Sequence, residues 1–350
     1  MSTSSYRATV ASIRTVYGKR LQWQDYRELI GLHSVSEIAS YLKNTDAYGS
    51  ILQNIEPAFV HRGHLETLLQ RSIFEHDMHF CKMEQLQQSP FFRFFIMDYE
   101  IQELFKAIQL LPEYNGDYVS EMATWLEPYA CFSLSELARA RTYEEIVAAV
   151  DHTPYYNVLK AFFSSDNLKN DFTDLEIALR SCYLQKLRED ARKIVTKKND
   201  LTALEQCIGE QIDLINLINA YRLKSVFHTD NDTLKSMMLP VQGKLPTRII
   251  EQLYNAVDTN DFRQILKTTQ YGRQLGSTVS FDHVQMENAF MRLRYRTAQN
   301  ALHFSGHAAV SLYAVHFLFQ VEVQNLITII ESVRYGKSAS FMQEHLILDT

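Results

Sequence analysis

Residues that interrupt helices are scarce in this chain. Among its 350 residues there are 11 glycines and 7 prolines. No glycine occurs between Gly116 and Gly209, and no proline occurs between Pro154 and Pro240. Alternating β-branched runs joined by Asn-Gly turns, which indicate strands, are also missing. Because Gly and Pro are the least favourable residues in a helix interior, their scarcity predicts an all-α protein.

An excess of positive charge is absent as well. The 35 Lys and Arg residues are outnumbered by 41 Asp and Glu residues, for a formal net charge of −6. Nucleic-acid-binding domains usually carry a basic patch and a high pI, so this balance argues against nucleic acid as a main partner. The 46% of apolar residues is enough for sizeable cores, and the length allows two or three helical bundles.

Signals for disulfides, secretion and membrane spanning are missing. The four cysteines form no C-x-x-C pair, which is typical of reduced thiols in a cytosolic protein; they are Cys81, Cys131, Cys182 and Cys207. The first ten residues have no apolar region of a signal peptide. The longest apolar run near the C-terminus, 308–319, is too short to cross a bilayer. We expect a soluble protein that can still sit on a membrane complex.

Motifs for catalysis and cofactor binding are also missing. Residues 335–338 (Tyr-Gly-Lys-Ser) resemble the end of a phosphate-binding loop, but Glu331 stands where that loop needs glycine. A helix C-terminus with Gly336 at C′ is the favoured interpretation. The histidines between His61 and His79 lack the H-E-x-x-H order and a second carboxylate–His motif. We therefore predict no catalytic residue, metal, cofactor or small-molecule substrate.

What the chain does have is a pattern that occurs three times. Each copy runs Leu, an N-cap residue, an acidic residue, two apolar residues and Thr, with spacings of five, three, one, four and three residues. The copies are Leu29, Ser34, Glu37, Ile38, Leu42, Thr45; Leu137, Thr142, Glu145, Ile146, Val150, Thr153; and Leu253, Asp258, Asp261, Phe262, Leu266, Thr269. The pattern predicts a capping box followed by a helix with one apolar face. A tyrosine follows each Thr: Tyr48, either Tyr155 or Tyr156, and Tyr271.

A second recurring motif enlarges the repeated unit. An acidic residue stands 55, 60 and 53 residues after the three Thr residues, at Glu100, Asp213 and Glu322, and each is followed by a Leu four positions on. The two motifs recur at a period of roughly 110 residues, which is too long for a solenoid repeat. We predict three helical bundles at 1–111, 112–229 and 230–337, with a C-terminal tail at 338–350.

Three local features complete the helix predictions. The segment 202–224 carries a Thr202/Glu205 capping box and an apolar face. Four phenylalanines after Pro90, at positions 91, 92, 94 and 95, predict a buried helix start. Basic residues gather at 180–198 and at Arg292, Arg294 and Arg296, where a solvated face or an electrostatic partner contact would explain them.

Several segments together resemble a known family. The residues concerned are Tyr6, Ile13-Arg14, Leu21, Asp25-Tyr26, Leu29, 34–37 (Ser-Val-Ser-Glu), Leu42, 45–49 (Thr-Asp-Ala-Tyr-Gly), 213–217 (Asp-Leu-Ile-Asn-Leu), 221–224 (Tyr-Arg-Leu-Lys) and 322–326 (Glu-Val-Gln-Asn-Leu). They are similar to the C subunit of archaeal and bacterial V/A-type ATPases (ATP synthases), whose eukaryotic counterpart is the d subunit of the vacuolar ATPase. The resemblance covers about residues 6–337. Gln320, Val321 and Gln324 depart from the family's Lys, Glu and Arg.

The resemblance implies a three-lobed helical funnel with pseudo-threefold symmetry. It also implies a non-catalytic central-stalk (rotor) subunit, peripheral on the cytoplasmic side of the membrane, between the proteolipid ring and the shaft subunits of D and F type. A protein in this place couples ATP turnover to H⁺ or Na⁺ transport, and the sequence does not distinguish the two ions. We expect Arg292, Arg294 and Arg296 to lie on a partner-facing helix.

Two alternatives stay open at this point. A free-standing helical adaptor built from the same repeats would purify alone from cytosol. An α-helical enzyme with a histidine–carboxylate site at 61–79 would contain stoichiometric metal.

Overall fold

The fold is all-helical in every residue that the structure describes. The computed structural model describes residues 5–83, 89–112, 122–164, 172–275 and 283–348, and it assigns no strand within them. The chain divides into two compact units. The first contains Met1–Gln88, Val195–Phe227 and Gly243–Thr350, and the second contains Ser89–Ile194 and His228–Gln242. The prediction of an all-α protein is confirmed, whereas the three repeat boundaries stay a prediction.

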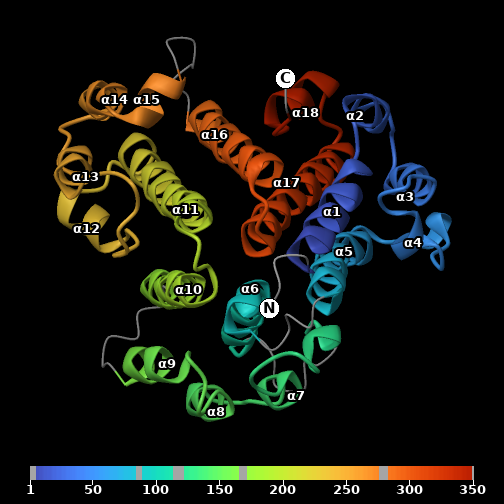
Figure 1. The fold of residues 1–350 in the computed structure, drawn as a ribbon, viewed down its shortest axis with the longest axis horizontal. Coiled ribbons are helices and arrows are strands. Elements are labelled where there is room, and N and C mark those ends of the chain that lie inside the picture. The colour runs from blue at the N-terminus through green and yellow to red at the C-terminus, as the bar shows by residue number, and fades with distance from the viewer. Residues whose placement is uncertain (1–4, 84–88, 113–121, 165–171, 276–282, 349–350) are drawn as a thin grey trace. The chain divides into compact units, whose positions relative to one another are not determined.

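The first unit is built around the long helix α17. Its helices are α1 (Ser5–Gly18), α2 (Trp23–Ile30), α3 (Val35–Lys43), α4 (Gly49–Leu52), η1 (Pro57–Phe59), α5 (Arg62–Met83), α11 (Lys198–Ser225), α13 (Thr247–Tyr254), α14 (Thr259–Thr268), α15 (Gln270–Leu275), α16 (His283–Phe304), α17 (Ala308–Arg334) and α18 (Ala339–His345). Helix α17 packs against α1, α5, α11 and α16 (Figure 1). The N-terminal and C-terminal segments of the chain therefore share one core.

The second unit has a smaller set of helices. They are η3 (Pro90–Arg93), α6 (Phe94–Leu110), η5 (Thr124–Leu126), α7 (Leu134–Leu137), α8 (Tyr143–Ala149), α9 (Tyr156–Phe163), α10 (Thr173–Ile194) and α12 (Asn231–Ser236). Helix α6 packs against α7, α8 and α10. The four phenylalanines after Pro90 are all buried at the start of α6, which confirms the predicted buried helix start.

The predicted N-caps are present in all three copies of the repeated pattern. The side chains of Ser34, Thr142 and Asp258 accept hydrogen bonds from the backbone N–H three residues on. The acidic residues at those positions bond back to the N–H that precedes each cap, at distances of 2.8, 2.6 and 3.0 Å. Each cap side chain thus satisfies an N–H group that has no partner within the helix, and the predicted N-caps are confirmed. The acidic side chain bonds one residue earlier than in the predicted capping box, where it would reach the N–H of the cap residue itself.

The Thr residue that ends each copy closes the helix and orients a tyrosine. The hydroxyls of Thr45, Thr153 and Thr269 donate to the carbonyl three residues back, at 2.6 to 2.7 Å. Each also accepts a backbone N–H two or three residues on. In the second copy the buried tyrosine is Tyr155, whereas Tyr156 is half-buried. The structure therefore decides between the two tyrosines that the spacing left open.

Helix α17 ends as its sequence predicts. Gly336 has a φ of 61°, the left-handed conformation that glycine adopts without strain. Its N–H bonds to the Val333 carbonyl, and the Lys337 N–H bonds to the Ser332 carbonyl. These two bonds form a Schellman motif, so the segment that resembles a phosphate loop is a helix C-terminus.

The apolar run at 308–319 belongs to a longer helix than the sequence suggested. By length and composition, α17 is the one helix among the described residues that could cross a membrane. However, 78% of its most apolar window is buried inside the protein. This burial is typical of a core helix.

The predicted capping box at Thr202 is wrong. Helix α11 begins at Lys198, so Thr202 lies one turn inside it. Residues 198–201 contain no Gly or Pro, and Asp200 supplies a negative charge in the first turn, where the helix dipole favours it. The helix therefore begins earlier than the capping motif indicated.

The predicted tail at 338–350 contributes to the core of the first unit over its described part. Leu346 and Ile347 are buried. The Asn325 side chain on α17 donates to the Ile347 carbonyl at 2.8 Å and accepts its N–H at 2.9 Å. One buried amide therefore satisfies both backbone groups of Ile347.

Replacing this amide should destabilise the fold. Asn325→Ala leaves the buried N–H and carbonyl of Ile347 without partners, which costs about 1–3 kcal/mol of unfolding free energy. Denaturant unfolding would measure the loss. Gln324→Ala, at an exposed position on the same helix, is the control and should change stability by less than about 0.5 kcal/mol. Equal effects from both variants would contradict this role of Asn325.

Candidate functional site

Three buried carboxylates recur in the same bonding arrangement. They belong to Glu100 on α6, Asp213 on α11 and Glu322 on α17, and all are at most 7% exposed. Each accepts the hydroxyl of the tyrosine that follows a repeat Thr, and each also accepts at least one backbone N–H from a loop. We call each such group an acid–tyrosine node.

The Glu322 node joins the two ends of the chain. The Tyr48 hydroxyl donates to Oε1 at 2.8 Å, and the Leu21 N–H donates to Oε2 at 3.1 Å. Leu21 lies between α1 and α2, and Tyr48 lies just before α4. Both oxygens of a carboxylate on the C-terminal core helix are thus held by the N-terminal segment.

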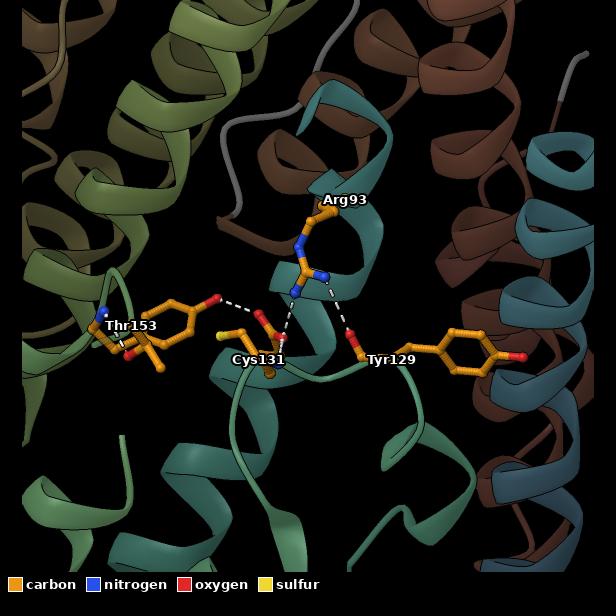
Figure 2. Close-up of polar contacts among 6 residues, drawn as sticks. Arg93, Tyr129, Cys131 and Thr153 are labelled. Atoms are coloured by element: carbon orange, nitrogen blue, oxygen red, sulfur yellow. Dashed lines mark hydrogen bonds and ion pairs between the residues drawn. The ribbon is translucent and has the colours of Figure 1, made fainter. Parts of the chain in front are cut away.

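The Glu100 node includes an ion pair. The Tyr155 hydroxyl donates to Oε2 at 2.7 Å, and the Cys131 N–H donates to Oε1 at 2.7 Å. Arg93 also bonds to Oε1, at 2.9 Å, and to the Tyr129 carbonyl, at 3.2 Å. Figure 2 shows Arg93 bridging the loop of Tyr129 and Cys131 to the carboxylate on α6. Charge-assisted bonds of this kind are stronger than neutral ones.

The Asp213 node depends on a close approach of the backbone. Its Oδ2 accepts the Tyr271 hydroxyl and the N–H groups of Lys244 and Leu245, all at 2.8 Å. A Cβ atom on Gly243 would stand 1.8 Å from Asp213 Oδ1, a separation that no real contact allows. Glycine at position 243 therefore lets the loop reach the carboxylate.

The nodes link each predicted repeat to the next one. Glu100 of the first predicted repeat bonds to Tyr155 of the second, and Asp213 of the second bonds to Tyr271 of the third. Glu322 of the third bonds back to Tyr48 of the first. Each node therefore combines the acidic helix of one copy with the capped helix of the following copy.

Burial decides the protonation of these groups. It raises the pKa of Tyr48, Tyr155 and Tyr271, and the adjacent carboxylates raise it further, so the hydroxyls remain donors. Burial also raises the pKa of Asp213. It raises the pKa of Glu322 to about 7, because desolvation outweighs the bonds from Tyr48 and Leu21.

The node tyrosine should be distinguishable from its neighbour by mutation. Tyr155→Phe removes a buried donor to the Glu100 carboxylate and should lower the unfolding free energy by about 1.5–3 kcal/mol. Tyr156→Phe removes a hydroxyl whose contact is to the exposed Lys160 ammonium, and should cost less than about 0.5 kcal/mol. Denaturant unfolding of both variants tests this. A larger loss for Tyr156→Phe would refute the assignment.

The Glu322 node should make stability depend on pH. The folded pKa of Glu322, about 7, exceeds the ordinary value of 4.5, so its contribution is fully present below pH 4.5 and is lost as pH rises through 7. The loss is roughly 3 kcal/mol at most. Thermal unfolding from pH 5 to 8 should show this slope in the native protein and a flatter curve for Glu322→Gln.

The control for this measurement is Glu331→Gln. Glu331 lies on the same helix, but its side chain is 44% exposed. This variant should keep the slope of the native protein. If Glu322→Gln also kept it, another group would be responsible for the pH dependence.

The three arginines expected at a partner surface differ in their contacts and in their exposure to solvent. The Arg292 guanidinium donates to the Leu346 carbonyl at 3.3 Å. The Arg294 guanidinium lies over the Phe317 ring, 3.6 Å from its centroid, a favourable cation–π contact. Both residues are half-buried, whereas Arg296 is exposed. Of the three arginines, Arg296 is the one whose exposed side chain can contact a partner without breaking a contact inside the protein.

The histidine segment at 61–79 has a structural pair at its centre. Asp77 on α5 and His316 on α17 are buried and lie 2.6 Å apart, from Oδ2 to Nδ1. His61, His64 and His79 are exposed. Within the described ranges, no group of three or more His, Cys, Asp or Glu side chains could hold a metal ion.

The cysteines are not poised for nucleophilic chemistry. Burial raises the pKa of the Cys207 thiol to about 12. Partial desolvation and the neighbouring Glu100 carboxylate raise the pKa of the Cys131 thiol to about 12, although that residue is exposed at its surface. The thiolate is the reactive form of cysteine, and at neutral pH both side chains remain thiols.

The nodes could have been partly inferred from the sequence. Their acids and tyrosines all belong to the recurring motifs, and an acidic residue beside apolar ones on a helix is a signal for a buried, bonded carboxylate. The pairing of Glu322 with Tyr48, 274 residues apart, has no local signal. Neither do Arg93, Gly243 or the backbone donors.

These features define a class of protein. It is a helical scaffold in which three recurring nodes hold sequence-distant helices together. The family model described as ATP synthase (C/AC39) subunit matches residues 9–345. The chain belongs to that family.

Curated relatives agree with the family. A protein of Methanosarcina mazei, named as the C subunit of an A-type ATP synthase, is 24% identical over 353 residues, covering 99% of this chain and 94% of the relative. A protein of the same name from Thermococcus kodakarensis is 24% identical over 264 residues, covering 73% of this chain and 68% of the relative. One from Methanosarcina acetivorans is 21% identical and covers 99% and 94%.

Proposed function

We propose that this chain is a non-catalytic central-stalk (rotor) subunit of a V/A-type rotary ATPase. In this role it couples the shaft subunits of D and F type to the membrane proteolipid ring during ATP-linked H⁺ or Na⁺ transport. The observation that carries the proposal is the family match over residues 9–345. The relatives named as C subunits of A-type ATP synthases, alignable over nearly the whole chain, support it.

The packing of the chain suits the transmission of torque. A coupling element must deform little under load, and close-packed helices have low compressibility. The three nodes join helices that are 55, 58 and 274 residues apart in sequence. Because each node ties the acidic helix of one repeat to the capped helix of the next, load on one repeat passes to its neighbour.

The proposed arrangement is a three-lobed funnel of the repeats 1–111, 112–229 and 230–337. The threefold recurrence of caps and nodes supports it. A funnel of three lobes would receive the shaft in its centre. It would rest on the ring as a peripheral subunit on the cytoplasmic side, with α17 acting as a core helix.

Arg296 is the proposed partner contact on α16. It shares an exposed stripe with Asn300 and His303, and Phe304 at the end of that helix is 78% exposed. Exposed aromatic and arginine side chains are frequent anchors of protein interfaces. Arg292 and Arg294 would support this face from within the bundle.

Charge reversal at Arg296 tests both the surface and the function. The tagged native chain should co-purify from detergent-solubilised membranes with the nucleotide-binding, shaft and proteolipid subunits. Arg296→Glu should reduce their recovery by about tenfold, because it repels an acidic partner patch without disturbing the fold. Arg248→Glu, at an exposed position on α13, is the control and should leave the recovery unchanged.

The outcomes separate the hypotheses. If the native chain purified alone from cytosol, the alternative of a free-standing helical adaptor would replace the rotor subunit. If the native chain co-purified with the complex and Arg296→Glu did so equally well, the function would stand and the Arg296 surface would be wrong.

A further inference from the structure

A cavity of about 160 Å³ with a mixed polar and apolar lining lies in the first unit beside the Glu322 node. The end of α1, the segment before α4, the middle of α5 and helix α17 surround it. This volume is several times the minimum that a water molecule needs. The cavity can therefore hold a small polar ligand with some water.

Nitrogen donors line this cavity together with the carboxylates of Asp46 and Glu322. Lys19 and Arg20, at the end of α1, form no ion pair with any described residue. The Arg20 guanidinium lies over the Tyr17 ring at 4.4 Å and has one long hydrogen bond, 3.4 Å, to the Tyr17 carbonyl. Most of its five N–H groups thus remain available to a ligand.

A third donor comes from α5. The His76 ring stacks on Phe319 at 5.0 Å, and none of the described residues forms a hydrogen bond with it. Burial lowers the pKa of His76, so at neutral pH the ring is uncharged and keeps one N–H. The Ser50 hydroxyl at the cavity wall adds a fourth donor.

We propose that this cavity binds a tetrahedral oxyanion, a phosphate or sulfate group, through Lys19, Arg20, His76 and Ser50. Guanidinium and ammonium groups together are the usual partners of such anions in proteins. An apolar ligand would leave these donors unsatisfied. When Glu322 is protonated, the two positive side chains outnumber the one remaining carboxylate of the wall, Asp46, so the cavity then favours an anion over a cation. The proposal is independent of the rotor function, because it rests on this cavity alone.

The Glu322 carboxylate makes the site sensitive to pH. It lies in the cavity wall, and both of its oxygens already accept hydrogen bonds from Tyr48 and Leu21. An ionised Glu322 repels an incoming anion, whereas a protonated one does not. Anion binding should therefore take up a proton and strengthen as pH falls.

The other groups that face Glu322 do not reverse this pH dependence of anion binding. Those that titrate or carry charge are Tyr17, Lys19 and Arg20 from α1, Asp25 and Tyr26 from α2, Asp46 and Tyr48 before α4, His76 from α5 and Tyr295 from α16. The lysine and the arginine attract an anion, and the two aspartates repel it, whether or not Glu322 is protonated. Any protonation of His76 at lower pH would favour the anion as well.

Calorimetric titration of the full chain with sodium sulfate at constant ionic strength tests the site, since sulfate does not titrate in this range. The native chain should bind saturably, and more tightly at pH 6 than at pH 8. The double variant Lys19→Gln, Arg20→Gln should raise Kd about tenfold or more. The matched control is Arg27→Gln, Lys82→Gln, which removes two exposed charges outside the cavity, and it should change Kd less than about twofold.

Single variants keep the test decisive if the double variant folds poorly. Lys19 is exposed, so Lys19→Gln should fold normally and raise Kd about threefold. Glu322→Gln should bind sulfate at pH 8 as tightly as the native chain does at pH 6. No saturable binding, or equal loss in the control, would overturn the proposal.

Vesicles identify the source of the anion. Flotation with phosphatidylcholine vesicles, with and without phosphatidylglycerol, is compared with titration by inorganic phosphate. Phosphate binding that needs Lys19 and Arg20, without vesicle binding, identifies free phosphate as the ligand. Binding to anionic vesicles that sulfate displaces, and that the double variant loses, identifies a lipid headgroup. Vesicle binding that the double variant retains, with no sulfate or phosphate binding, refutes the site.

Discussion

The structure depends on one constraint: a carboxylate taken out of water must be hydrogen-bonded where it lies. Glu100, Asp213 and Glu322 are buried on core helices, and each obtains its donors from a tyrosine and a loop that belong to another part of the chain. The bonds therefore require those segments to be in place. Removing one partner from such a group costs more than the bond itself contributes, and this asymmetry favours a single arrangement of the helices.

The three nodes satisfy this constraint to different degrees. Glu100 has the Arg93 guanidinium at 2.9 Å, and Asp213 has a second backbone N–H. Glu322 has one hydroxyl and one N–H, with no ion pair to a described residue, and burial raises its pKa to about 7. The carboxylate that joins the N-terminal segment to α17 thus changes its charge near neutral pH. The Glu322 node is also the node beside the cavity for which we propose an oxyanion.

Local sequence signals were reliable where the interaction joins residues that are close in sequence. A cap side chain reaches an N–H three residues away, so Ser34, Thr142 and Asp258 could be assigned from spacing alone. Gly336 could be assigned from its place after a helical run. A local signal was wrong where the residues around it also favour a helix. Thr202 has a capping sequence, but the helix already begins at Lys198, four residues earlier. The row of arginines on α16 suggests one charged face, yet Arg292 and Arg294 are drawn into contacts with Leu346 and Phe317.

The sequence alone determined the helical class, the three caps, the recurrence of an acidic residue and a tyrosine, and the family resemblance. These properties follow from residue type and from spacing within a few turns of helix. Only the tertiary structure decided which tyrosine bonds to each acid, including the choice of Tyr155 over Tyr156. It also decided that Arg20 and His76 share a cavity. Such pairings join residues up to 274 positions apart, and they exist only after packing has removed the carboxylates from water.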